Sequence, residues 1–289
     1  MNYIGQVWRP PSEASSLIIQ ATVGCSHNHC RFCSMYKQKA FFIRPVDDIV
    51  KDLKEMRILT SYVPKIFLAD GDALVIKTDD LIIILDIIKQ LYPECTSITC
   101  YASPRSIKNK SETDLKKLNH SNLKMVYMGL ESGDDLVLSH INKGATAHEI
   151  ITAGNKIRKS GIKLSVTAIS GLGGTSQWKA HAIHTAYALS TMKPEYIGLL
   201  TLNLQPGSSL YKDVQSGIFN LMNPIQIASE TRLLLSYIDS DGSIFRANHS
   251  SNYVNLAGTL NTDIPKMIRK LDAALTGQLP FRPEEMRDL

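Results

Sequence analysis

The chain has 289 residues, of which 44% are hydrophobic, and a net charge of +5. This length and apolar content suffice for one large core, whereas no apolar run is long enough to predict a membrane span. No Lys/Arg-rich block supports a nucleic-acid partner, and five cysteines with three clustered do not form the paired framework of a secreted protein. We therefore expect a cytoplasmic protein with no membrane partner.

Short apolar runs typical of strands alternate along the chain with segments whose apolar residues recur at helical spacing. The predicted strands are 17–23, 65–69, 97–101, 124–129, 163–169 and 196–202. The predicted helices among them are 46–56, 79–91, 112–118, 134–140, 147–159 and 178–192. Strands separated by helical crossovers favour parallel pairing with the helices outside. Six such units predict an α/β fold, an incomplete barrel of the TIM type.

The pattern changes beyond the sixth strand. We expect a lead at 1–15, a core at 16–210 and a C-terminal extension at 211–289 that caps the barrel and contacts substrate. Helices are predicted at 224–237 and 263–275. The segment 243–253 between them is interpreted as a loop rich in polar side chains, namely Arg246, Asn248, His249, Asn252 and Tyr253.

His249 and Tyr253 are the candidate catalytic residues, because either side chain can deliver or remove a proton. The alternative is that the polar side chains of this segment only cap the open barrel. The sequence leaves both interpretations open.

Three cysteines, Cys25, Cys30 and Cys33, lie in one short loop directly after the first predicted strand. Three thiolates can hold three irons of a [4Fe–4S] cluster and leave the fourth iron open to a small molecule. The same cysteines with His27 or His29 can instead form a four-coordinate zinc site. No second Cys or His pair at ligand spacing follows, which favours the cluster.

The other two cysteines, Cys95 and Cys100, flank the start of the third predicted strand. Cysteine is among the residues most often buried. We interpret both as packed thiols and not as cluster ligands.

The cysteine loop resembles that of radical S-adenosylmethionine (SAM) enzymes, whose usual signature has three and then two residues between the cysteines. Here the first gap has four residues. Phe32, just before the third cysteine, also fits that family, in which this side chain packs near the adenine of SAM. From the cysteine loop to the Arg-Ala-Asn-His segment, the chain resembles stand-alone proteins of the branch that includes anaerobic coproporphyrinogen oxidase and the catalytic subunit of Elongator.

The resemblance implies a [4Fe–4S] cluster and SAM as cofactors. It also implies that SAM chelates the open iron, and that an electron from the cluster cleaves SAM to methionine and a 5'-deoxyadenosyl radical that abstracts hydrogen from a substrate. We expect a reductant such as flavodoxin or ferredoxin to supply the electron.

In barrels of this kind the active site gathers at the C-terminal ends of the strands. The second strand ends in Asp70, Gly71 and Asp72, which resemble the family element Gly-Gly-Glu that binds the SAM amino group. Two aspartates replace the usual Gly and Glu, so either carboxylate is a candidate. The alternative is a plain turn, since Asp-Gly is a common turn dipeptide.

The third and fourth strands are followed by Ser103 and by Glu131 with Ser132, which we assign to SAM binding. The resemblance implies that Glu131 accepts hydrogen bonds from the ribose hydroxyls. Lys143 stands where relatives hold a basic residue against the SAM carboxylate, and many of them have Arg. The alternative is a solvated lysine beside a turn.

The fifth strand contains Thr167 and Ile169 and leads to Gly171, resembling the family's glycine element that lines the adenine. The backbone at Leu202, after the sixth strand, is expected to complete the adenine pocket. The full glycine fingerprint of a dinucleotide-binding fold is absent.

Two function classes compete. The first is an enzyme, of oxidoreductase or transferase type, that starts radical chemistry on a small organic or cofactor-like substrate. The second is a non-enzymatic module that handles iron–sulfur clusters, zinc or haem, or senses redox state. Only the enzyme must cleave SAM.

Overall fold

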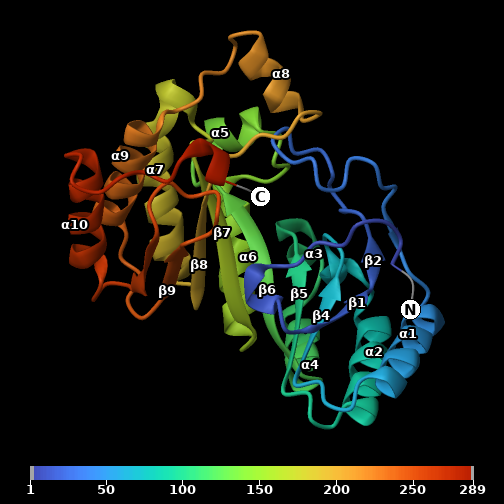
Figure 1. The fold of residues 1–289 in the computed structure, drawn as a ribbon. Helices are drawn as coiled ribbons and strands as arrows, with labels where there is room; N and C mark the ends of the chain where they lie inside the picture. The colour runs from blue at the N-terminus through green and yellow to red at the C-terminus, as the bar shows by residue number, and fades with distance from the viewer. Residues whose placement is uncertain (1–2, 288–289) are drawn as a thin grey trace. The chain divides into compact units, whose positions relative to one another are not determined.

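The computed structural model describes residues 3–287, which divide into two compact units (Figure 1). The first unit contains the described residues up to Asn28 together with Met35–Met128 and Ala153–Leu164. The second contains His29–Ser34, Gly129–Thr152 and the described residues from Ser165 onward.

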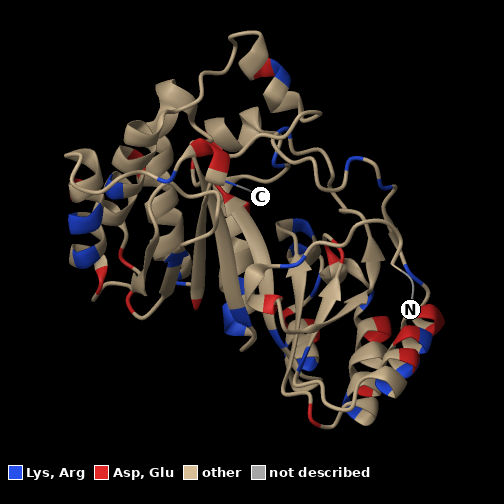
Figure 2. Cartoon of the chain, in the orientation of Figure 1, with Lys and Arg blue, Asp and Glu red and all other residues tan. Residues whose placement is uncertain are grey.

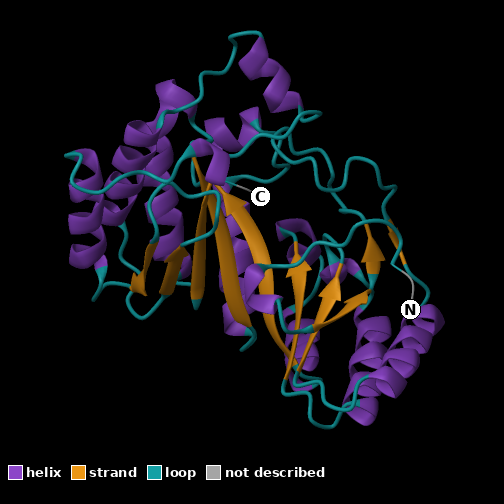
Figure 3. Ribbon diagram, viewed as in Figure 1, coloured by secondary structure: helices purple, strands orange, loops and turns teal. Residues whose placement is uncertain are grey.

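Within the described residues, strands (orange in Figure 3) form an eight-stranded sheet, and their order in it is β1-β4-β5-β6-β7-β8-β9-β10. The strands are β1 (Leu17–Gln20), β4 (Lys65–Ala69), β5 (Ser97–Ala102), β6 (Leu123–Glu131), β7 (Lys163–Ser170), β8 (Tyr196–Thr201), β9 (Ile244–Ala247) and β10 (Leu256–Thr259). Strands β1, β4, β5 and β6 pair in parallel in that order, as do β7, β8 and β9, whereas β10 runs antiparallel to β9. The predicted α/β fold of a partial TIM-like barrel is confirmed.

A separate hairpin pairs β2 (Thr22–Val23) with β3 (Phe42–Ile43). The predicted first strand, 17–23, is therefore two strands. Ala21, at the break between them, donates its backbone N–H to the carbonyl of Ala69 at the end of β4 and accepts from the backbone N–H of Arg44. The two short strands thus flank the cysteine loop.

Helices lie at all the positions that the sequence predicts. They are α1 (Val46–Leu59), α2 (Thr78–Leu91), α3 (Pro104–Lys108), α4 (Glu112–His120), α5 (Asp135–His140), α6 (Ala147–Lys159), α7 (Gly174–Met192), α8 (Ser209–Gln215), α9 (Pro224–Tyr237) and α10 (Ile264–Leu275), with 3-10 turns η1 (Pro11–Glu13), η2 (Ala73–Val75) and η3 (Glu284–Met286). Helices α3 and α8 were not predicted, and α7 begins before residue 178. None of the helices in residues 3–287 has the length and apolar character needed to cross a membrane.

Short polar motifs start several of these helices. Ser103 caps α3 and Ser111 caps α4: each side chain accepts a hydrogen bond from the backbone N–H three residues on, and each backbone N–H donates to the side chain of that residue in a capping box. Asn223 caps α9 in the same way, with Pro224 as the first helical residue. These caps satisfy backbone donors that the first turn leaves without partners.

The first unit has an aromatic core beneath its strand ends. Phe67 of β4 contacts the rings of Tyr101 and Tyr127 edge-on, with ring centroids 5.1 Å and 6.1 Å apart. Helix α1 packs against α2 and β1. On α1, acidic and basic side chains are interspersed, so this helix presents no single-sign surface (Figure 2).

In the second unit, α7 packs against α9, and α9 packs against α10. The interpretation of 243–253 as a loop is wrong for its first half, because residues 244–247 form β9 alongside β8. Phe245 and Ala247 are buried and Arg246 is exposed between them, which is the two-residue alternation of a strand. The strand is too short for this alternation to stand out from the polar residues that follow it.

Arg44 and Asp52 form a buried ion pair, with 2.7 Å between Nη1 and Oδ2 and only 9% of each side chain exposed. Arg44 also donates to the carbonyl of Gln20 at 2.6 Å, which ties the start of α1 to β1. Losing one partner leaves the other charge buried and costs about 3–5 kcal/mol. We expect Arg44→Met to lower the melting temperature clearly, as measured by circular dichroism.

The matched control is the exposed pair between Arg232 and Asp272, whose side chains are 44% and 45% exposed. An exposed pair contributes about 1 kcal/mol or less. Arg232→Met should therefore change the melting temperature little, and equal shifts for the two variants would contradict the buried-pair account.

Candidate functional site

The widened cysteine gap is accommodated by Asn28, whose φ of 46° places it in the left-handed region. Asparagine tolerates that conformation better than most residues. Its side-chain amide donates to the carbonyl of Tyr36 at 2.8 Å, and Lys37 donates to the Asn28 carbonyl at 2.8 Å. The extra residue thus forms a turn with its own hydrogen bonds.

The five cysteines differ in their surroundings. Cys25, Cys30 and Cys33 are half-buried, whereas Cys95 and Cys100 are buried. Burial raises the pKa of the Cys95 thiol and of the Cys100 thiol. A buried thiol with a raised pKa is a poor metal ligand, because ligation needs the thiolate. The interpretation of these two cysteines as packed thiols agrees with their burial.

Cys25 belongs to the first unit, and Cys30 and Cys33 belong to the second. Among residues 3–287, no three Cys, His, Asp or Glu side chains form a group that holds a metal ion. The argument that these residues fit a [4Fe–4S] cluster therefore rests on the donor set. The loop has three partly exposed thiols, which can bind three irons and leave the fourth open.

Asp72, at the β4 exit, is fully buried and receives four hydrogen bonds. Its Oδ2 accepts from the hydroxyls of Ser26 at 2.5 Å and Ser103 at 2.7 Å. Its Oδ1 accepts from the Ser106 hydroxyl at 2.7 Å and the Ser103 backbone N–H at 3.2 Å. Burial raises the pKa of Asp72, while the hydrogen bonds from the serines act in the opposite direction. Both carboxylate oxygens have partners within the first unit.

Asp70 is also fully buried, but its two oxygens differ. Oδ2 forms an ion pair with Lys39 at 2.8 Å and accepts from the backbone N–H of Gly24 at 3.3 Å. Oδ1 is buried and receives no hydrogen bond. The Tyr36 hydroxyl is likewise buried without a hydrogen-bond partner, and burial together with the charge of Asp70 raises the pKa of Tyr36. An unpaired buried acceptor is costly, which marks Asp70 as a binding candidate.

Gly71 lies between these two aspartates and touches the cysteine loop. Its backbone N–H donates to the carbonyl of Gly24 at 3.1 Å. A Cβ at this position would lie 2.9 Å from the Cβ of Cys25 and 3.0 Å from its Cα. Only glycine permits so close a backbone approach.

In the second unit, Arg31 anchors the other half of the loop. Its guanidinium Nη2 pairs with Asp213 of α8 at 2.5 Å, and its Nη1 donates to the carbonyl of His140 at 3.2 Å. Its backbone N–H donates to Ile141, and its carbonyl accepts from Leu210. The loop is therefore held by side-chain and backbone bonds in both units.

The β6 exit carries Glu131 in a left-handed conformation, with φ at 63°. A glutamate in that region is unusual and often marks a functional site. Its Oε1 pairs with Lys143 at 2.8 Å, and both side chains are nearly buried. A Cβ on Gly129 would lie 1.9 Å from that Oε1, so the glycine makes room for the pair.

A second buried network joins the exits of β6 and β7. Ser132 shares a hydrogen bond of 2.7 Å with Nδ1 of His181, whose Nε2 lies 3.1 Å from the carbonyl of Ile169. Glu230 of α9 accepts from the Ser170 hydroxyl and, at 2.7 Å, from the Gly171 backbone N–H. Burial raises the pKa of Glu230. The predicted glycine element is thus fastened by a helix of the C-terminal extension.

Three further residues were predicted to bind SAM. The side chains of Thr167 and Phe32 lie outside these hydrogen-bond networks, and Leu202 forms hydrogen bonds through its backbone. Thr167 is half-buried in β7, and Phe32 is half-buried in the cysteine loop. Leu202 donates its backbone N–H to the carbonyl of Ser170 at 2.9 Å, and its own carbonyl accepts from Arg287 at 3.0 Å. The Leu202 backbone is therefore fixed at the β8 exit.

The candidate catalytic residues lie in the C-terminal extension. Tyr253 is buried, its hydroxyl donates to Glu284 at 2.7 Å and accepts from Arg287, and burial raises its pKa to about 12. His249 is half-buried, and its Nδ1 lies 3.1 Å from the Ser251 hydroxyl. Arg282 donates to the carbonyls of His249, Ser250 and Asn252, so the tail secures this segment.

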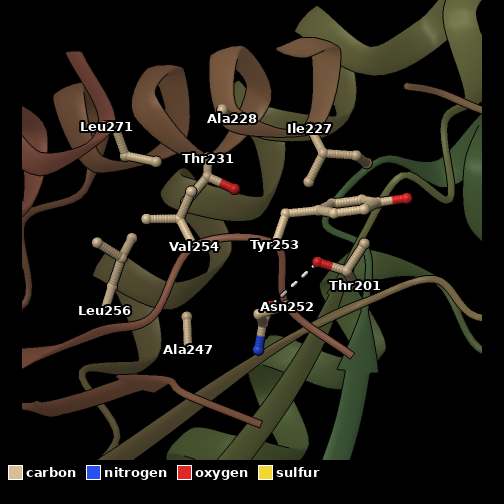
Figure 4. A pocket seen from close by; sticks show the side chains of 10 residues that line it. All are labelled: Thr201, Ile227, Ala228, Thr231, Ala247, Asn252, Tyr253, Val254, Leu256 and Leu271. Atoms are coloured by element: carbon tan, nitrogen blue, oxygen red, sulfur yellow. Dashed lines mark hydrogen bonds between the residues drawn. The ribbon is translucent and has the colours of Figure 1, made fainter. Parts of the chain in front are cut away.

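Tyr253 also borders two cavities. One has about 10 Å³, enough for about one water, and lies between α9, α10 and the strands β9 and β10 (Figure 4). There Asn252 accepts from the Thr201 hydroxyl at 3.0 Å, which fixes the segment to β8. The other, of about 340 Å³, opens beside the tail residues 279–283 and falls in the size range of small-molecule sites.

Sequence reasoning missed several residues of these networks, namely Ser26, Arg31, Lys39, Ser106, His181, Asp213, Glu230, Arg282 and Arg287. For Ser106 a signal existed, because Ser-Pro-Arg-Ser is the start of a capped helix. For Glu230 the sequence offered little indication of burial, since a single acidic residue on an amphipathic helix is normally exposed.

We expect Gly71→Ala to displace the cysteine loop, because the added methyl group meets the Cys25 backbone and not a flexible side-chain end. Overpacking of this kind costs about 1–3 kcal/mol. Because this cost disfavours the loop conformation that binds the cluster, the iron and sulfide content after anaerobic reconstitution should fall below about half of the wild-type value. Gly198→Ala is the control, because its nearest neighbour would lie at 3.8 Å. Equal iron loading of both variants would contradict the close-approach account.

Comparison with known proteins agrees with the predicted branch. The chain is 23% identical over 228 residues to the haem chaperone HemW of Bacillus subtilis strain 168, a match that covers 75% of this chain and 58% of that protein. Coproporphyrinogen III oxidase HemN from Escherichia coli is 15% identical with a TM-score of 0.58, covering 76% of this chain and 52% of that one. Elp3 of Methanocaldococcus infernus is 13% identical with a TM-score of 0.52, covering 81% and 59%.

The chain thus spans little more than half the length of these three proteins, and the structural likenesses show the fold. Residues 19–185, more than half of the chain, match the model of the radical SAM superfamily. Members of that superfamily are generally enzymes and bind a [4Fe–4S] cluster and SAM. With its three-cysteine loop and its partial barrel, this chain belongs to the radical SAM superfamily.

Proposed function

We propose that the chain is a radical SAM enzyme that abstracts hydrogen from a small organic or cofactor-like substrate, with Cys25, Cys30 and Cys33 as the cluster ligands. When bound, the cluster supplies one electron that cleaves SAM to methionine and a 5'-deoxyadenosyl radical. An external reductant such as flavodoxin or ferredoxin provides that electron. The observation that carries the proposal is the loop of three partly exposed thiols in a chain of this superfamily.

At the β4 exit, Asp70 is the acceptor that we assign to the SAM amino group. Its Oδ1 is buried and accepts no hydrogen bond, so an N–H of the bound SAM amino group would satisfy it. Lys39 pairs with the other oxygen of Asp70, Oδ2, and leaves Oδ1 without a hydrogen bond. Asp72 has no acceptor to spare, because both of its oxygens are already hydrogen-bonded. Gly71 lets the backbone approach the loop.

In the second unit, we assign Glu131 to the ribose hydroxyls and Lys143 to the SAM carboxylate. The 2.8 Å ion pair orients both side chains before ligand binds. A carboxylate has several lone pairs and an ammonium has three donors, so each can hold more than one partner. Ser103, Ser132, Thr167, Ile169, Gly171 and Leu202 remain assigned to the SAM site, with Phe32 beside the adenine.

On the substrate side, His249 and Tyr253 are the proposed proton-transfer groups. A phenol with a pKa of about 12 stays protonated at neutral pH, so Tyr253 carries a proton to donate and is not in the form that removes one. His249 is half-buried and can take either role. The substrate then meets the C-terminal extension.

The test is anaerobic reconstitution with iron and sulfide, dithionite reduction, addition of SAM and chromatography for 5'-deoxyadenosine. We expect 5'-deoxyadenosine from the wild type and none above background from Cys30→Ala, which lacks one cluster ligand. Cys95→Ala is the control, because this thiol is buried outside the loop. Stoichiometric zinc with no cluster would overturn the proposal.

A second candidate function is haem handling, which the 23% identity to a haem chaperone favours. Titration with haem distinguishes the two. One haem per chain, seen as a Soret band, with a cluster present but SAM left intact would favour this second function. 5'-Deoxyadenosine formation without stoichiometric haem binding would favour the first.

Lys143→Met removes the proposed cation for the SAM carboxylate, and the loss of one charged hydrogen bond should raise the apparent KM for SAM about tenfold. Lys143→Arg should keep the wild-type value, because Arg also pairs with carboxylates. The rate of 5'-deoxyadenosine formation against SAM concentration measures both. Lys159→Met, an exposed lysine of α6, is the control. An unchanged KM in Lys143→Met would exclude this assignment.

A further inference from the structure

The bonds around Asp72 connect three segments of the first unit that are far apart in sequence. Ser26 lies next to the first cysteine, Asp72 follows β4, and Ser103 and Ser106 begin α3 after β5. The carboxylate is 0% exposed, and the Ser26 hydroxyl donates to it at 2.5 Å. Hydrogen bonds to a charged acceptor are roughly twice as strong as neutral ones.

A plain turn does not require this arrangement. An aspartate that only shapes a turn bonds its own backbone about two residues on. Asp72 instead receives hydrogen bonds from residues that are 46, 31 and 34 positions away in sequence. Three hydroxyls pointed at one buried carboxylate make it a junction between the cysteine loop and two strand exits.

We propose that Asp72 is a positioning residue: it holds Ser26, and through Ser26 the backbone at Cys25, in the geometry in which the cluster binds SAM, without touching SAM itself. This inference rests on the proposed function. It gives the second acid of the Asp-Gly-Asp element a role different from that of Asp70.

The widened cysteine gap explains why a hydrogen bond between Ser26 and Asp72 is needed. Four residues between the first two cysteines have more conformational freedom than three, and fixing each residue costs about 1–2 kcal/mol of entropy. Asn28 secures one end of the gap through its bond to Tyr36. Ser26 secures the other end, directly beside the first thiol, through Asp72.

The test is a double-mutant cycle on the reconstituted protein with Ser26→Ala, Asp72→Ala and the double variant. The readout is electron paramagnetic resonance of the reduced cluster during titration with an uncleavable SAM analogue, in which nitrogen replaces the sulfonium sulfur, so that the affinity of the open iron is measured without turnover. We expect each single variant to weaken SAM binding about tenfold, the loss of one charged hydrogen bond. The double variant should be no weaker than Asp72→Ala, because Ser26 acts through Asp72.

Ser106→Ala is the matched control, because it removes one hydrogen bond from Asp72 without touching the cysteine loop. It should change the SAM affinity less than threefold while lowering the melting temperature. Ser26→Thr, which keeps the hydroxyl, should retain wild-type affinity. If Asp72→Ala does not fold, Ser26→Ala and Ser26→Thr with Asp72→Asn complete the test.

Two outcomes would overturn the proposal. Additive losses, or a loss in Asp72→Ala with none in Ser26→Ala, would mean that Asp72 contacts SAM itself. Equal effects of Asp72→Ala and Ser106→Ala, with a normal spectrum for Ser26→Ala, would mean that Asp72 only stabilises the fold. Failure of the wild type to form a cluster would instead count against the proposed function, so the two failures are distinguishable.

Discussion

The backbone of Gly71 passes so close to Cys25 that a methyl group on Gly71 would lie 2.9 Å from the Cys25 Cβ. This contact sets where the first thiol stands above β4. The same stretch supplies the hydrogen bond from Gly71 to Gly24, and its two flanking aspartates hold Gly24 and Ser26. The end of one buried strand therefore shapes the cysteine loop, and a larger residue at position 71 would disturb all of these bonds together.

Buried carboxylates hold the loops at the ends of three strands, β4, β6 and β7. Asp72, Glu131 and Glu230 are all nearly inaccessible, and each accepts hydrogen bonds or an ion pair from a segment distant in sequence. Removing a carboxylate from water is expensive unless its oxygens are satisfied. The donors must therefore stay close to each carboxylate, and this requirement fixes the positions of the loops that carry them.

The sequence predicted the repeating strands and helices because their apolar periodicity is local, as in β4 and α9, whose bounds match the expectation. It predicted the cysteine loop because thiol spacing is also local. It could not predict that Glu230 fastens Gly171, since that bond joins residues 59 positions apart and depends on tertiary packing. The sequence did not predict β9, because four residues give too little periodicity. These residues form a strand because they pair with β8.

Asp70 and Asp72 show why residue type alone does not assign a site. They are two positions apart, equally buried and equally acidic, and the motif that they resemble does not distinguish them. Their hydrogen bonds do. Both oxygens of Asp72 accept hydrogen bonds from serines and a backbone amide, whereas Oδ1 of Asp70 is buried and accepts none. Because an unsatisfied buried acceptor favours the arrival of a donor, this difference supports our proposals that Asp70 binds SAM and that Asp72 supports the loop.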